Sequence, residues 1–143
     1  MALRYLRTSK KRTKNKKIEW DYAPDIERRI AYLIELLHLD WLTASSIHCV
    51  RSNNAQTRAI ARIWGLGRVW QITLNLKPAY VLEVISEKFD RESEEERDKI
   101  LLHELVHIPR NFSGALLPHK KHGKGSFHDR LDRMIERYYE MKK

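Results

Sequence analysis

The sequence predicts a single α+β domain with an N-terminal helix, a small and mostly antiparallel sheet, a helix that carries an H-E-x-x-H motif, and a C-terminal helix. Three observations lead to this fold class. Apolar residues recur at helical spacing near both ends, short β-prone runs separated by turn residues fill residues 46–85, and the motif lies in an apolar helical run at residues 100–109. A chain of 143 residues can bury one core and needs no second domain.

The composition excludes several classes of protein. Hydrophobic residues make up 42% of the chain and charged residues 33%, as in globular proteins, and no apolar run approaches the roughly 18 residues of a membrane span. The first residues lack the apolar core of a signal peptide, so we expect a cytoplasmic protein. Cys49 is the only cysteine, which excludes an internal disulfide and a cysteine-rich zinc site. Any metal ion must therefore be held by histidine and carboxylate side chains.

The positive charge is concentrated at the N-terminus. Residues 1–17 contain eight basic residues and no acidic one, so they carry eight of the nine net charges of the chain. We expect a disordered basic arm over residues 1–17, attracted to polyanions such as DNA, and a folded domain over residues 18–143. The alternative is a solvated tail that only aids solubility. The candidate nucleic-acid-binding residues are Arg4, Arg7, Lys10, Lys11, Arg12, Lys14, Lys16 and Lys17.

The segment after the arm predicts a core-packing helix that begins at Pro24 and Asp25. Proline suits the first turn of a helix, because its fixed φ is helical and its missing N–H would have no partner there. Apolar residues then follow at intervals of three and four, at Ile26, Ile30, Leu33, Ile34 and Leu37.

The middle of the chain predicts the strands of the sheet. Residues 47–51 form a short β-prone run, and a polar loop follows. Residues 59–64 and 68–74 read as two strands of a hairpin joined by a glycine-containing turn. Residues 80–85 form a further strand directly before the motif helix.

The motif helix should begin near Ser93 and bring two histidines onto one face. Ser93 is followed by three glutamates, which reads as a capping box with acidic residues that suit the helix dipole. His103 and His107 lie four residues apart, so both imidazoles can reach one metal ion. Glu104 then lies beside that ion, where a zinc hydrolase needs a carboxylate to accept a proton from water. Pro109 ends the helix, so that a later residue can return to the metal.

A third ligand is expected after the helix, because a catalytic zinc ion usually takes three protein ligands and leaves one position to water. Residues 110–125 form a loop with two candidates, His119 and His122. His119 is favoured since Pro118 restrains its backbone, and His128, Asp129 or a later glutamate remain further alternatives. The chain then ends in an amphipathic helix with apolar residues at Phe127, Leu131, Met134, Ile135, Tyr138 and Tyr139.

Residues 103–119 read HELVHIPRNFSGALLPH and resemble a family of small, mostly archaeal proteins regarded as metallopeptidases. The likeness includes residues 61–66 and 80–106, so it spans most of the chain after the arm. The resemblance implies a compact zincin-like fold that binds zinc, with His103 and His107 as ligands, Glu104 as general base and His119 as third ligand.

A more distant likeness is to SprT-like zinc proteases, which use H-E-x-x-H and a later His-Gly segment ahead of an aromatic residue. His122 and Gly123 followed by Phe127 resemble that segment, but the spacing is one residue longer. The choice between His119 and His122 therefore stays open. SprT-like proteases act on proteins attached to DNA, which with the basic arm implies DNA-associated substrates.

We expect a zinc metallopeptidase acting on a protein or peptide substrate, with no membrane partner. An edge strand beside the metal would pair with an extended substrate main chain. One alternative is a nucleic-acid-binding protein with a structural or inactive metal site, and another is a metal-dependent hydrolase of a different bond. An open metal position beside a groove favours the peptidase, a fourth protein ligand favours a structural site, and a deep closed pocket favours the other hydrolase.

Overall fold

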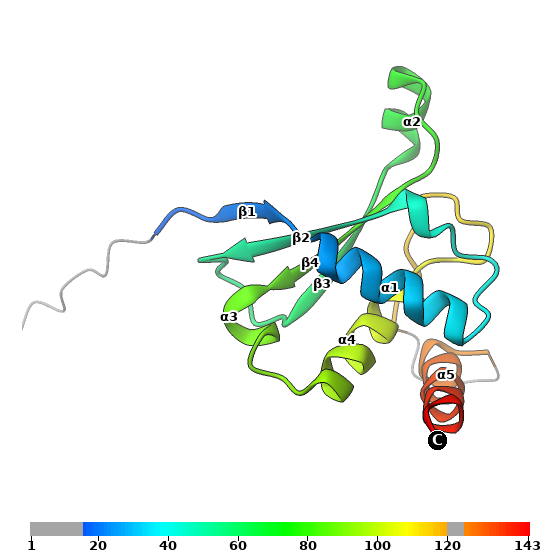
Figure 1. Cartoon of the computed structure of the whole chain (residues 1–143). Helices are drawn as coiled ribbons and strands as arrows, with labels where there is room; N and C mark the ends of the chain where they lie inside the picture. The colour runs from blue at the N-terminus through cyan, green and yellow to red at the C-terminus, as the bar shows by residue number, and fades with distance from the viewer. Residues whose placement is uncertain (1–15, 120–124) are drawn as a thin grey trace, which may run out of the picture.

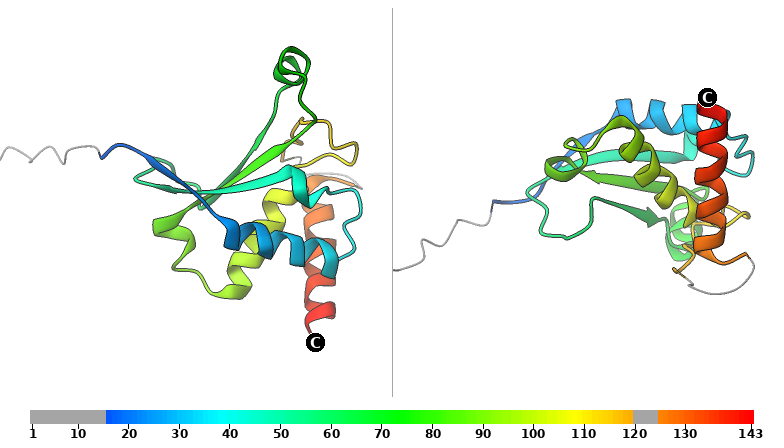
Figure 2. Two further views of the ribbon diagram at one scale, coloured as in Figure 1. Left: turned by 45° about the horizontal axis from the view of Figure 1, so that its top comes forward. Right: turned by 90° about the horizontal axis from the view of Figure 1, so that it is seen from below.

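The computed structural model describes residues 16–119 and 125–143. These residues form a four-stranded sheet with helices α1 and α4 on one face, and α5 runs alongside α4 (Figures 1 and 2). The elements are β1 (Glu19–Tyr22), α1 (Pro24–Leu36), the short 3-10 helix η1 (Ala44–Ser46), β2 (Ile47–Asn53), β3 (Ala61–Gly65), α2 (Arg68–Leu74), β4 (Tyr80–Ile85), α3 (Ser86–Phe89), α4 (Glu94–Val106) and α5 (Phe127–Lys142). The predicted α+β class and the predicted N-terminal, motif and C-terminal helices are confirmed.

The sheet is mixed and has the strand order β1-β2-β4-β3. Strands β2 and β4 run parallel, whereas β1 pairs with β2 and β3 pairs with β4 in antiparallel fashion. Two of the three pairings in the described sheet are therefore antiparallel, as predicted. Strands β1 and β3 form its edges, and β3 is the edge next to α4.

The core lies between the helices and one face of the sheet. Leu33 of α1, Leu82 of β4 and Leu102 of α4 are fully buried in it. Alternate residues of a strand point to opposite faces, so Leu82 and Val84 face the helices while Glu83 faces the other side. Within the described residues, no helix is both long and apolar enough to cross a membrane.

The segment 68–74 is a helix, so the prediction of a second hairpin strand there was wrong. Gly67 occupies the N-cap position and Asn75 ends the helix in the left-handed conformation. The side-chain amide of Gln71 donates to two backbone carbonyls outside the helix, at 2.8 Å each. Seven residues are too few for a helical period to show, and their β-branched side chains favoured a strand. Helix α2 projects from the end of the β3 and β4 pair (Figure 1).

Strand β1 was not predicted, because the sequence between the arm and α1 lacks a buried face. All four of its residues are exposed, and they pair with the outer side of β2. Its residues Glu-Trp-Asp-Tyr do alternate between polar and aromatic, but four residues are too few for this alternation to indicate a strand. Most of the predicted disordered arm, residues 1–15, lies outside the described residues, so its disorder stays a prediction.

Glu83 holds the β3 edge strand onto β4 from the face opposite the helices. Its carboxylate is fully buried and accepts hydrogen bonds from Arg62 Nε at 2.6 Å, Ser52 Oγ at 2.6 Å and Trp64 Nε1 at 3.0 Å. Burial alone would raise the pKa of this carboxyl, but the hydrogen bonds from Arg62, Ser52 and Trp64 hold it below its ordinary value of 4.5. The buried charge is therefore compensated by β2 and β3 together.

Replacing Glu83 with alanine should lower the free energy of unfolding by about 3 kcal/mol, because Arg62, Ser52 and Trp64 lose a shared acceptor. Urea denaturation measures this change, and Glu35→Ala, at an exposed position of α1, should change it little. The carboxylate stabilises the fold fully above its unfolded pKa and loses this effect as pH falls through the lower folded pKa. The difference between wild type and Glu83→Ala should therefore narrow below about pH 4.5, and a constant difference down to about pH 3 would contradict the assignment.

Candidate metal centre

Helix α4 presents His103 and His107 on one face, as the sequence predicts. The side chain of Ser93 caps the helix by accepting from the backbone N–H of Glu96 at 3.2 Å, which fixes the start of the helix. Leu102 and Leu105 are fully buried on α4. The two imidazoles therefore belong to a helix that is anchored in the core.

The chain turns back after α4 and orients His107. The backbone N–H of Leu117 donates to the carbonyl of His107 at 2.7 Å. In the opposite direction, Nδ1 of His107 lies 2.6 Å from the carbonyl oxygen of Leu117, so this nitrogen carries the proton and donates it. The other nitrogen, Nε2, then has its lone pair available for a metal ion. Such a hydrogen bond to a carbonyl commonly fixes the orientation of a metal-binding histidine.

His119 completes a group of three imidazoles with His103 and His107. One ring nitrogen from each lies within 4.8 Å of the others, and Nε2 of His103 is 3.1 Å from Nε2 of His119. Phe127, the first residue of α5, packs against all three rings at centroid distances of 5.0, 4.4 and 4.7 Å. Among the described residues, these three histidines are the group that could hold a metal ion.

Burial keeps the imidazoles of α4 in their neutral form. Burial and, to a smaller extent, the neighbouring histidines together lower the pKa of His103 to about 4. Burial also lowers the pKa of His107, although the carbonyl of Leu117 opposes this shift. A neutral imidazole has the lone pair that a metal ion needs, so both side chains are ready to bind one at neutral pH.

Glu104 lies beside the histidines in an apolar setting. Its side chain is buried on α4, and burial raises the pKa of this carboxyl to about 7. A carboxyl group that exchanges its proton near neutral pH suits general base and acid chemistry.

The loop that carries His119 is held by residues of the sheet that no sequence motif marks. The hydroxyl of Tyr80 accepts from the backbone N–H of Gly114 at 2.8 Å and donates to the carbonyl of Ala115 at 2.9 Å. A Cβ atom on Gly65 would lie 2.0 Å from the carbonyl oxygen of Gly114, so only glycine permits this contact. In the sequence, Gly65 and Gly114 are the only sign of this contact, and one sequence alone does not show that these two glycines meet.

The other predicted site residues that the structure describes lie outside the three-histidine group. His128 is exposed on α5 and lies outside the three-histidine group, and Asp129 instead pairs with Arg133 at 3.0 Å. His122 is outside the described residues, so its candidacy stays a prediction. Lys16 and Lys17 of the arm are exposed, and its other basic residues lie outside the described part of the chain.

Metal content should distinguish the ligands from the other histidines. We expect about one zinc ion per chain in the wild type and almost none in His103→Ala, His107→Ala or His119→Ala, because two imidazoles hold zinc weakly. His128→Ala is the matched control and should keep the metal. Elemental analysis after dialysis measures this, and loss of zinc in His122→Ala with retention in His119→Ala would contradict the assignment of the third ligand.

The chain matches the model of a known protein family over most of its length. The model of the family described as "Putative phage metallopeptidase" matches residues 18–142. No curated protein and no solved structure matches the chain. The family match begins where the predicted arm ends and includes the whole metal centre. The chain therefore belongs to this phage metallopeptidase family.

Proposed function

We propose that the protein is a zinc-dependent metallopeptidase in which His103, His107 and His119 hold the ion and Glu104 is the general base. The observation that carries the proposal is the meeting of the three imidazoles of His103, His107 and His119 beside the buried carboxyl group of Glu104 on α4. The family gives a metal-dependent peptidase, and the donor set supports zinc as the metal.

The number of ligands favours a catalytic over a structural site. The group that could hold an ion has three histidines among the described residues, and no cysteine or carboxylate of that part of the chain joins it. Structural zinc sites are closed by four protein ligands, whereas catalytic sites use three. This supports the peptidase over the alternative of a nucleic-acid-binding protein with a structural metal.

In this mechanism the chain supplies proton transfer and orientation. A bound zinc ion would lower the pKa of water and polarise the scissile carbonyl. Glu104 accepts the proton of the attacking water and then donates it to the leaving amine, so the carboxyl changes its protonation state twice in each cycle. The hydrogen bond from His107 to Leu117 and the packing of Phe127 keep the imidazoles in position through both steps.

The surroundings of the histidines suit an extended peptide. An open groove of about 330 Å³ lies between the start of β3, α4 and α5, and its walls include Ala61, His103 and Glu104. Ile60 accepts a hydrogen bond from Ile85 of β4 at 2.9 Å. In an antiparallel ladder, the residues that hydrogen-bond to the neighbouring strand alternate with residues whose backbone N–H and C=O point outward. The backbone groups of Ala61, Ile63 and Gly65 therefore point away from β4. A substrate strand would bind to these edge groups above Glu104.

Glu104→Gln tests the proposed chemistry. The amide cannot accept a proton, so kcat should fall by about 10²- to 10⁴-fold while zinc content is unchanged. Peptidase assays and elemental analysis on the same preparation measure both quantities. Glu136→Gln, at an exposed position of α5, is the control and should keep full activity. Retained activity in a zinc-loaded Glu104→Gln protein would refute the role of this residue.

The basic arm supports a narrower proposal, that the substrates are proteins bound to DNA. Residues 1–17 carry eight positive charges and no negative charge, and Lys16 and Lys17 are exposed where the described chain begins. Phosphate contacts by such residues release counterions, so binding weakens steeply with salt. Deleting residues 1–17 should abolish most DNA binding at low salt in a fluorescence anisotropy assay. Equal binding by the truncated protein would disprove the role of the arm.

A further inference from the structure

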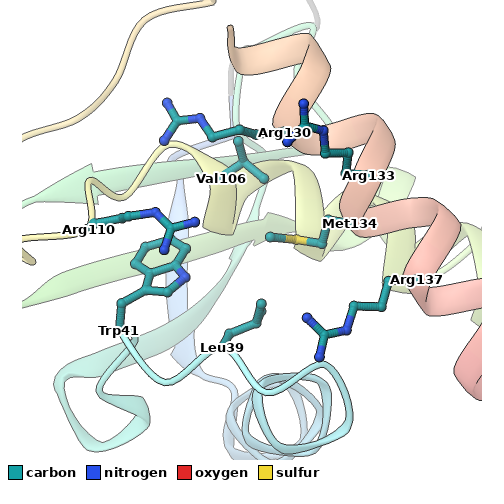
Figure 3. A pocket seen from close by; sticks show the side chains of 8 residues that line it. All are labelled: Leu39, Trp41, Val106, Arg110, Arg130, Arg133, Met134 and Arg137. Carbon is teal, nitrogen blue, oxygen red and sulfur yellow. The ribbon is translucent and has the colours of Figure 1, made fainter. Parts of the chain in front are cut away.

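A second pocket lies between the end of α4, helix α5 and the segment that follows α1 (Figure 3). Its volume is about 180 Å³. Val106 lines it from α4, and Arg130, Arg133, Met134 and Arg137 line it from α5. The metal groove uses other residues of the same two helices, so the two sites occupy different helix faces.

Four arginines surround this small pocket, and three of them have no carboxylate partner among the described residues. These three are Arg110, Arg130 and Arg137, whereas Arg133 pairs with Asp129 at 3.0 Å. The Nε atom of Arg130 is buried and has no hydrogen-bond partner in the described part of the chain. A buried guanidinium N–H without an acceptor is costly, and the four positive charges repel one another, although weakly, because Arg110, Arg133 and Arg137 are exposed. An anion in the pocket would remove both costs.

The rest of the lining is apolar and includes one large aromatic ring. Leu39 and Val106 are buried, Met134 is half-buried, and Trp41 forms a side wall. In Figure 3 the guanidinium groups of Arg110 and Arg130 lie on the side of Trp41, and Arg137 lies toward the opposite end. A ligand that fits this lining has an anionic end and a flat apolar part.

We infer that this pocket binds a phosphorylated nucleotide, with the phosphate on the arginines and the base against Trp41. A phosphate monoester carries more negative charge than a carboxylate and has three acceptor oxygens, which matches several guanidinium groups at once. Bases stack well on tryptophan, whatever their identity. The nucleotide is either a free mononucleotide or the phosphorylated end of a strand, since both present the same chemistry. This binding does not depend on the proposed peptidase activity.

Isothermal titration of the full-length, zinc-loaded chain with AMP tests the inference. AMP should bind at one site, and adenosine should bind at least tenfold more weakly because it lacks the phosphate. Arg130→Gln and Arg137→Ala should each weaken AMP binding about tenfold through loss of a charged donor. Trp41→Leu should also weaken it about tenfold through loss of stacking. Arg137 is exposed, so its variant keeps the test valid if Arg130→Gln does not fold.

Several controls distinguish nucleotide binding in this pocket from binding at the metal centre or at scattered surface charges. Arg28→Ala removes an exposed arginine of α1 and should leave AMP affinity unchanged. AMP binding that is lost in His103→Ala but kept in Arg130→Gln and Arg137→Ala would place the ligand at the metal centre and overturn the inference. Equal affinity for adenosine and AMP, or for O-phosphoserine and AMP, would also overturn it.

The source of the nucleotide is identified by competition. A short DNA strand with a 5′-phosphate should displace AMP if the pocket binds strand ends, and the unphosphorylated strand should not. If neither strand displaces AMP, the ligand is the free mononucleotide. In both cases, the binding of AMP must be weakened by substitution of Arg130 or Arg137. Equal displacement of AMP by the strands with and without the 5′-phosphate would contradict the inference.

Discussion

The metal centre depends on a buried carboxylate that fixes helix α4. Asp98 is fully buried and accepts hydrogen bonds from Nε of Arg29 on α1 at 2.6 Å and from the hydroxyl of Tyr138 on α5 at 2.5 Å. A buried charge of this kind is strongly destabilising unless its hydrogen bonds are all made, so the relative positions of the three helices are tightly constrained. His103 lies little more than one turn further along α4, and its position follows from this constraint.

The other half of the centre is fixed by the sheet. His119 comes from a loop, and loops are seldom precise unless something rigid holds them. The hydroxyl of Tyr80 on β4 forms hydrogen bonds with the N–H of Gly114 and the carbonyl of Ala115 in this loop. Gly65 of β3 has no side chain, which lets the backbone of Gly114 approach closely. The helices thus place two imidazoles and the sheet places the third, which is why the site requires the complete fold.

The sequence predicted helices correctly where the apolar pattern was long and a capping residue marked its start. The motif helix and the C-terminal helix have apolar residues at helical spacing, and Ser93 caps the former as expected. The strand prediction for segment 68–74 was wrong because five of its seven residues are β-branched or apolar and fit either structure, and tertiary contacts of Gln71 decide the outcome. Neither the contact of Tyr80 with the loop that carries His119 nor the position of His119 beside His103 and His107 follows from spacing, because both depend on how distant segments pack.

The buried carboxylates among the described residues are engaged elsewhere, so none of them pairs with Arg110, Arg130 or Arg137 of the arginine pocket. Outside the metal centre, the buried carboxylates of the described chain are Asp98 and Glu83. Asp98 is engaged by Arg29 and Tyr138, and Glu83 is engaged by β2 and β3 on the far face of the sheet. Neither can turn toward Arg130 without leaving its own donors unpaired, and that loss would outweigh the new contact. An anion from outside the chain is the partner that we infer for the buried Nε of Arg130.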